Sequence, residues 1–259
     1  MATKTRKQIE FLNFSKSIVS KNYFSQNGED GFLEGILSRI PEKDFNCVEF
    51  GAWDGQHLSN TYHLISEKNY KGVLIEGEKE RFIDLKNNMS KFNTICFNRW
   101  VDYKTSSKDS LDNILAETDL PKNFDLLSID IDGNDYHIWN SLKNYAPKVV
   151  IIEINYTLMP DVEVINEPDS PTIWGVSGSS IKSLNNLGIK KGYTLIGNVG
   201  CNAIFIHNDY TNIFIDKPFS IEDIYTFEGV RIKDLNFIQF IKMFKTKLRK
   251  QYFKLKKLF

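Results

Sequence analysis

The sequence CVEFGAWDG, residues 47–55, decides the fold of this chain, because a short apolar strand is followed there by a turn through two glycines. A second apolar run, GVLIE at residues 72–76, ends in Glu76. Gly51 lets the backbone pass close beneath a ligand, and Gly55 is expected to open a helix whose free N–H groups face the same space. An acid at the end of the neighbouring strand can accept both hydroxyls of a ribose. The pattern predicts the first half of a nucleoside-binding α/β unit.

The turn also carries acids, since Glu49 precedes it and Asp54 lies within it. This differs from the GxGxxG pattern that cradles phosphates. Negative side chains repel the phosphates of a dinucleotide and suit a ligand that carries an amino group and a sulfonium. S-adenosylmethionine is therefore favoured over NAD as the ligand. A nucleotide-dependent oxidoreductase and a non-catalytic cofactor-binding module remain alternative functions.

Composition is typical of a globular domain with a sizeable core, since 41% of the 259 residues are hydrophobic and 25% are charged. The formal net charge of +0 gives no general attraction to nucleic acid. Cys47, Cys96 and Cys201 are scattered, which favours buried reduced thiols over disulfides or a zinc site. The N-terminus lacks the apolar core of a signal peptide, and no run reaches the ~20 apolar residues of a membrane span. A soluble, cytoplasmic protein is expected.

Apolar runs and helix-length segments alternate along the middle of the chain. We expect strands at 47–50, 72–75, 94–97, 126–129 and 149–152, and helices at 81–90, 110–117, 136–144 and 179–187. This alternation indicates an α/β fold with a parallel sheet and helices on both faces. Two further strands at 193–196 and 202–206 are expected to form a terminal hairpin.

We expect three parts in the chain: a helical lead-in over 1–44, a core over 45–212 and a basic helical extension over 213–259. The lead-in has helices at 6–20 and 31–39 and completes the cofactor site. Within the core, the Pro-rich segment 156–178, with Trp174, is expected to form a lid or acceptor wall. The extension carries apolar residues at helical spacing among lysines, which suits docking on the domain, a homodimer contact or a peripheral membrane contact: Phe237, Phe240, Ile241, Phe244 and Leu248.

Polar residues gather where the fourth and fifth strands end, and the carboxyl ends of parallel strands are where open α/β sheets bind ligands. Candidate catalytic residues are Asp130, Asp132 and His137, with Asp135 beside them. Oxygen-rich ligands suit Mg²⁺ or Mn²⁺, and the candidate metal ligands are Asp130, Glu153 and Asn155. Alternatively, Asp130 and Asp132 cap the following helix and His137 is structural.

Six stretches in this order resemble the class I S-adenosylmethionine-dependent methyltransferases, and within them the FkbM-like group, which methylates sugars and related hydroxylated metabolites. The matching stretches are SQNGEDG at 25–31, VEFGAWDGQHLSNT at 48–61, GVLIEGEKERF at 72–82, LLSIDIDGNDYHIW at 126–139, VVIIEIN at 149–155 and GCNAIFIHND at 200–209. One departure is Gly77, because the group often has Pro after the ribose-binding acid.

The resemblance implies a Rossmann-like, seven-stranded, mostly parallel sheet that ends in an antiparallel hairpin. It implies S-adenosylmethionine as cofactor, and the residues expected to bind it are Gln26, Glu29, Glu49, Gly51, Asp54, Glu76, Trp100 and Asp130. It further implies O-methylation of a carbohydrate hydroxyl, with a nucleotide-linked sugar for surface polysaccharide as the expected small-molecule acceptor. A sugar hydroxyl is a poor nucleophile at neutral pH, so a general base or a divalent cation must assist the transfer.

Overall fold

The structure is a computed structural model, and it describes residues 4–19, 21–172, 177–227 and 230–231. The elements in chain order are α1 Arg6–Val19, α2 Glu29–Leu37, β1 Asn46–Phe50, α3 Tyr62–Glu67, β2 Lys71–Glu76, α4 Lys79–Met89, β3 Thr94–Asn98, α5 Leu111–Leu115, β4 Leu126–Ile129, α6 Asp135–Ser141, β5 Val149–Glu153, α7 Ile181–Lys190, β6 Tyr193–Val199, β7 Asn202–His207, α8 Asn208–Phe214, α9 Ile221–Ile224, β8 Thr226–Phe227 and β9 Val230–Arg231.

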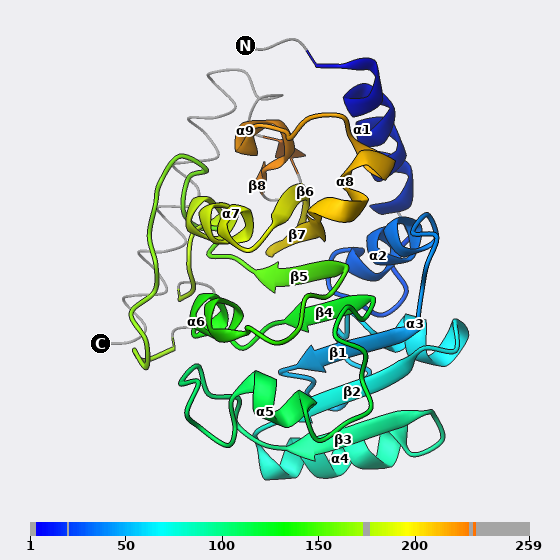
Figure 1. Cartoon of the computed structure of the whole chain (residues 1–259), viewed down its shortest axis with the longest axis vertical. Coiled ribbons are helices and arrows are strands. Elements are labelled where there is room, and N and C mark those ends of the chain that lie inside the picture. Colours follow the sequence, from blue (N-terminus) through cyan, green and yellow to red (C-terminus); the bar gives the residue numbers. More distant parts are fainter. Residues whose placement is uncertain (1–3, 20, 173–176, 228–229, 232–259) are drawn as a thin grey trace.

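The seven strands form one sheet in the order β3-β2-β1-β4-β5-β7-β6. Strands β1 to β5 pair in parallel, and β7 is antiparallel to both β5 and β6. Figure 1 shows the strands stacked from β3 at the bottom to β6 above, with the arrowheads of β4 and β5 pointing left. All seven predicted strands and the terminal hairpin are confirmed. The order reverses between β1 and β4, which is where an open α/β sheet binds its ligand.

Helices cover both faces of the sheet because alternate residues of each buried strand point to opposite sides. Val48 and Phe50 of β1 belong to one apolar core, together with residues of α5, α6 and α7. Cys47 belongs to the other core, which α1, α2, α3, α4 and α8 cover. This alternation also sends Glu49 to the second face, away from Val48 and Phe50.

The prediction that a helix begins at Gly55 is wrong. Gly55 lies in a turn with φ +78°, and α3 begins only at Tyr62. A Cβ on Gly55 would meet Leu85 and Met89 of α4 at 2.7 Å, so the glycine serves a close approach between the turn and α4. The other predicted helices before residue 213 are confirmed with bounds shifted by up to three residues, whereas the short helices α3 and α8 were not predicted. The extension was expected to be helical, and its described part holds the short helix α9 but also the strands β8 and β9.

Two predictions fall outside the described residues: the role of Trp174 in the acceptor wall, and the contacts of the basic extension from 232 onward. Docking, dimerisation and membrane contact through the extension therefore stay predictions, as do the three expected chain parts. Within the described residues, no helix combines the length and the apolar character that crossing a bilayer would require.

Candidate functional site

A cavity of about 530 Å³ opens at the carboxyl ends of β1, β2, β3 and β4. Three of the residues predicted to bind the cofactor, Gly51, Glu76 and Trp100, line it. Much of the remaining wall comes from three segments far apart in the chain: residues 99–104 after β3, then Ile131, Gly133 and Asn134 after β4, and Asp169, Ser170 and Thr172 of the Pro-rich segment.

Gly51 follows β1 with φ +74°, where a side chain would be strained. Its amide donates a hydrogen bond of 3.1 Å to the carbonyl oxygen of Ile75 on β2. A Cβ at this position would overlap the carbonyl oxygen of Asp130 after β4. Only glycine therefore lets the three strand ends come together beneath the cavity.

The Glu76 carboxylate is fixed by two backbone amides and is 5% exposed. Its Oε2 accepts a hydrogen bond from Trp53 N at 2.9 Å, and its Oε1 accepts one from Glu78 N at 2.7 Å. Glu78 instead pairs with Arg81 at 2.8 Å and does not line the cavity. Of the two neighbouring acids, Glu76 is thus the one at the cavity wall.

Trp100 lies against the backbone after β2 and is 74% exposed. A Cβ on Gly77 would overlap the Trp100 ring. Gly77 therefore leaves room for the Trp100 ring against the backbone, and this residue forms one side of the cavity.

Glu49 does not line the cavity, because strand alternation turns it toward the segment before α3. Its Oε2 accepts hydrogen bonds from the hydroxyls of Ser59, at 2.7 Å, and Thr61, at 2.6 Å, and its Oε1 accepts one from Asn60 N at 2.9 Å. Burial raises the pKa of Glu49, and these hydrogen bonds oppose that effect. Its visible role is to hold residues 59–61 against β1.

Four other predicted cofactor residues also lie outside the cavity wall: Gln26, Glu29, Asp54 and Asp130. Asp54 closes its own turn, since its Oδ1 accepts from His57 N at 2.7 Å. Glu29 is fully buried and accepts a hydrogen bond from Asn202 Nδ2 at 3.2 Å, which ties α2 to the hairpin. Gln26 accepts from the Cys201 thiol at 3.7 Å. A direct role of these residues in cofactor binding stays a prediction.

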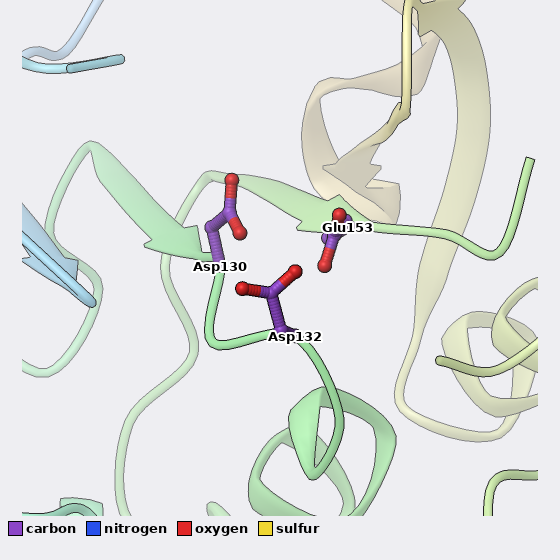
Figure 2. Close-up of side chains that lie close together, drawn as sticks. All are labelled: Asp130, Asp132 and Glu153. Carbon is purple, nitrogen blue, oxygen red and sulfur yellow. The ribbon is translucent and has the colours of Figure 1, made fainter. Parts of the chain in front are cut away.

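Figure 2 shows Asp130, Asp132 and Glu153 pointing toward one another from the ends of β4 and β5. One carboxylate oxygen of each lies within 4.8 Å of the others. Burial, and then the charges of Asp135 and Asp132, hold the pKa of Asp130 well above 3.8. Burial, and then Asp130, hold the pKa of Glu153 well above 4.5. Burial also raises the pKa of Asp132, against the opposing charge of Arg81.

Asn155, the third predicted metal ligand, is not in this group of three. Its Oδ1 accepts a hydrogen bond from Thr157 N at 3.0 Å. Asp132 takes its place because it has φ +58°, a left-handed conformation that turns it back toward Asp130. The conformation is held by Asp135, whose carboxylate accepts from Ile131 N at 3.0 Å and from Gly133 N at 2.8 Å. Helix capping was the alternative role for Asp130 and Asp132. Asp135 has a similar role, since it binds backbone amides just before α6, although the residue at the helix N-cap is Asn134.

His137 lies on α6, and its Nε2 is 2.7 Å from the carbonyl oxygen of Asn166. Because a carbonyl only accepts, Nε2 carries the proton in this arrangement. His137 therefore anchors the Pro-rich segment. Further along, the Tyr103 hydroxyl donates to Asp169 Oδ2 at 2.9 Å, and Asp169 N donates to the Asn134 side chain at 3.2 Å. Sequence analysis did not single out Tyr103 or Asn134, because their partner lies more than thirty positions away in the chain.

Comparisons with known proteins bear on this site. Residues 49–171 match the family model described as the methyltransferase FkbM domain. No curated protein sequence matches the chain significantly. Among solved structures, the N-terminal domain of EvdMO1 in the presence of SAH and D-fucose is 12% identical with a TM-score of 0.46, and the alignment covers 79% of this chain and 97% of that one.

Two further solved structures are similar at lower TM-scores. Monomeric WbdD is 18% identical with a TM-score of 0.40; the alignment covers 63% of this chain and only 36% of WbdD. A SAM dependent methyltransferase from Aquifex aeolicus is 15% identical with a TM-score of 0.39, covering 67% of this chain and 87% of that one. The family match favours methyl transfer over the oxidoreductase alternative.

Proposed function

Residues 49–171 belong to the methyltransferase FkbM family, of the class I S-adenosylmethionine-dependent type, and on that premise we propose that the chain methylates a hydroxyl of a carbohydrate. The acceptor we propose is a small, nucleotide-linked sugar destined for surface polysaccharide. The observation that carries the proposal is the placement of the cavity. All of its lining residues except Thr172 lie within the matched residues, and one of them, Ile131, lies between Asp130 and Asp132 of the acid cluster that Glu153 completes.

The residues that line the cavity suit the adenosyl group of the cofactor. Glu76 presents a carboxylate fixed by two amides, which suits the two hydroxyls of a ribose. Trp100 offers an exposed indole face for the adenine. Gly51 leaves the floor of the cavity free of a side chain. The sulfonium end then points toward the acids after β4 and β5, whose negative charge favours it.

The methyl group of a sulfonium is already activated, so the protein mainly has to align the acceptor oxygen with the S–CH₃ bond. Alignment of this kind supplies roughly 7–11 kcal/mol. Deprotonation of the hydroxyl is the second requirement, and a general base contributes about 10²–10⁴-fold. Asp130, Asp132 and Glu153 are suited to it, because a raised pKa brings a carboxylate closer to the basicity that the step needs.

The same three carboxylates fit a hard divalent cation, because Mg²⁺ and Mn²⁺ take oxygen ligands and a cation offsets three mutually close acids. Asp130, Asp132 and Glu153 are the residues that would hold it. Bound there, the cation would polarise the acceptor hydroxyl. We keep Mg²⁺ or Mn²⁺ as part of the proposal, with Asp132 in place of Asn155.

The test of methyl transfer uses labelled S-adenosylmethionine with a panel of nucleotide sugars and identifies the labelled product. Transfer to a sugar oxygen supports the proposal. Binding of the cofactor without methyl transfer to any nucleotide sugar, including those extracted from the source cells, would favour a non-catalytic module. Exhaustive chelation followed by Mg²⁺ or Mn²⁺ tests the cation, and full turnover in the chelated enzyme would exclude it.

A matched pair of variants tests where the cofactor lies. Glu76→Gln is expected to weaken binding of S-adenosylhomocysteine, because the ribose loses a charged acceptor, whereas Glu78→Gln is expected to leave it unchanged. Isothermal titration measures both. Equal affinities of the two variants would contradict the assignment of Glu76.

A further inference from the structure

Trp53 is an exposed tryptophan held at an unfavourable backbone angle. It has φ +48° and is 42% exposed. Bulky residues rarely adopt this region, because the side chain then crowds the following carbonyl. The conformation is fixed by the hydrogen bond of Trp53 N to Glu76 Oε2 at 2.9 Å. The turn thus presents a large apolar side chain to solvent directly beside the cavity wall.

A cation and an imidazole hold the indole in place. The guanidinium of Arg81, in the first turn of α4, lies 4.6 Å from the ring centroid of Trp53. The ring of His57 meets the indole edge-on at 5.3 Å. Such a stack pre-orients both the indole and the guanidinium, which lowers the entropy lost when a ligand binds them.

Arg81 keeps donors available. Its Nε lies 2.8 Å from Glu78, and both side chains are 46% exposed. Among the described residues, Glu78 is the acid within ion-pair distance of Arg81. The Nη edge has no hydrogen-bond partner among those residues. A guanidinium edge of this kind matches the two oxygens of a carboxylate or phosphate.

Trp53 and Arg81 lie next to both parts of the proposed reaction centre, which are the cofactor cavity and the acid cluster. Trp53 is bonded to Glu76 on the cavity side. On the other side, Arg81 is close enough to Asp132 for its charge to act on that carboxyl. An anionic acceptor that approached the acids after β4 and β5 would be repelled by them, and Arg81 is a cation that would offset this repulsion, in addition to Arg99 and Lys104 of the cavity wall.

We propose that Trp53 and Arg81 form an acceptor subsite for a sugar that carries an oxyanion, either a phosphate or a carboxylate. The indole packs against the apolar face of the sugar ring, and the Nη edge of Arg81 binds the oxyanion. The proposal rests on the proposed function, in which a nucleotide-linked acceptor already carries phosphate charge, and it adds the residues that bind an oxyanion of the acceptor.

Binding of three related sugars tests the subsite without turnover. The protein is saturated with S-adenosylhomocysteine and titrated with glucose, glucuronic acid and glucose 6-phosphate. At least one charged sugar is expected to bind about tenfold or more tightly than glucose, since a hydrogen bond to a charged group changes a dissociation constant by about that factor. The better of the two identifies the oxyanion as carboxylate or phosphate.

Variants assign the effect to the two residues. Arg81→Gln is expected to reduce the affinity for the charged sugar to that for glucose. Trp53→Leu is expected to reduce the affinity for every sugar that binds. Arg39→Gln is the matched control, because Arg39 also stacks on an aromatic ring, that of Phe14 at 3.4 Å, but lies beside the N-terminal helix α1. It is expected to change nothing.

Three results would overturn the subsite while S-adenosylhomocysteine still binds: equal affinity for charged and neutral sugars, no binding of either charged sugar, or an unchanged preference in Arg81→Gln. Loss of S-adenosylhomocysteine affinity in Arg81→Gln would also overturn it, since Arg81 would then serve the cofactor. Failure of the wild-type protein to bind S-adenosylhomocysteine at all is a different outcome, which refutes the proposed function itself.

Discussion

Replacing Gly77 with alanine should weaken cofactor binding and leave the stability of the fold almost unchanged. The added Cβ would overlap the Trp100 ring, so the ring must leave the backbone against which it lies. Trp100 is 74% exposed, so its displacement removes little buried area. We expect the free energy of unfolding to change by no more than about 0.5 kcal/mol, as for other surface changes.

Binding should respond much more strongly. Stacking of a base on an aromatic side chain contributes about 1–3 kcal/mol by alanine substitution, so loss of the Trp100 platform corresponds to roughly 5- to 150-fold weaker binding of S-adenosylhomocysteine. Isothermal titration gives the affinity, and urea unfolding gives the stability.

Gly133→Ala is the control for Gly77→Ala. Gly133 lines the same cavity, but a Cβ there would approach Thr172 Oγ1 only to 3.4 Å, an ordinary contact. We expect wild-type affinity for this variant. Wild-type affinity in Gly77→Ala, or equal losses in the two variants, would refute the role of Trp100.

Three further predictions concern the strand ends. Gly51→Ala should destabilise the fold by about 2–5 kcal/mol in urea unfolding, from the left-handed backbone and the overlap with Asp130; a smaller loss than about 1 kcal/mol would contradict the close approach. Glu153 has a raised pKa, so in the absence of metal the stability that its protonated form contributes at low pH should be lost as the pH rises above 4.5. Glu153→Gln should make the thermal unfolding temperature depend less on pH, and parallel pH profiles of the two proteins would contradict this. His137→Phe should raise the KM for the acceptor and leave the cofactor affinity unchanged, because the anchor to Asn166 is lost; a fall in kcat of about 10²-fold or more at unchanged KM would instead indicate a general base.

The sequence by itself determined the sheet. Each predicted strand, from 47–50 to 202–206, is a mostly apolar run; the residues of these strands are mostly buried, except in the edge strand β3, where residues 94–97 are half-buried. Local hydrophobicity is enough to mark such strands. Asp130 and Glu153 were also predicted to come together, because parallel strands end at one edge of the sheet. Gly51 and Glu76 were placed at the cavity for the same reason.

The tertiary structure decided which polar atoms face the ligand. Glu49 turned to the opposite face to meet Ser59 and Thr61, and Asn155 bonded to Thr157 while Asp132 joined the acids. The Pro-rich segment reached the cavity only through long-range contacts of its residues with α6 and the loop after β3. A side chain's direction depends on which donors and acceptors the folded chain brings within hydrogen-bond distance. The sequence does not mark such partners, whether they lie close in the chain, as Thr157 does to Asn155, or 66 positions apart, as Tyr103 and Asp169 do.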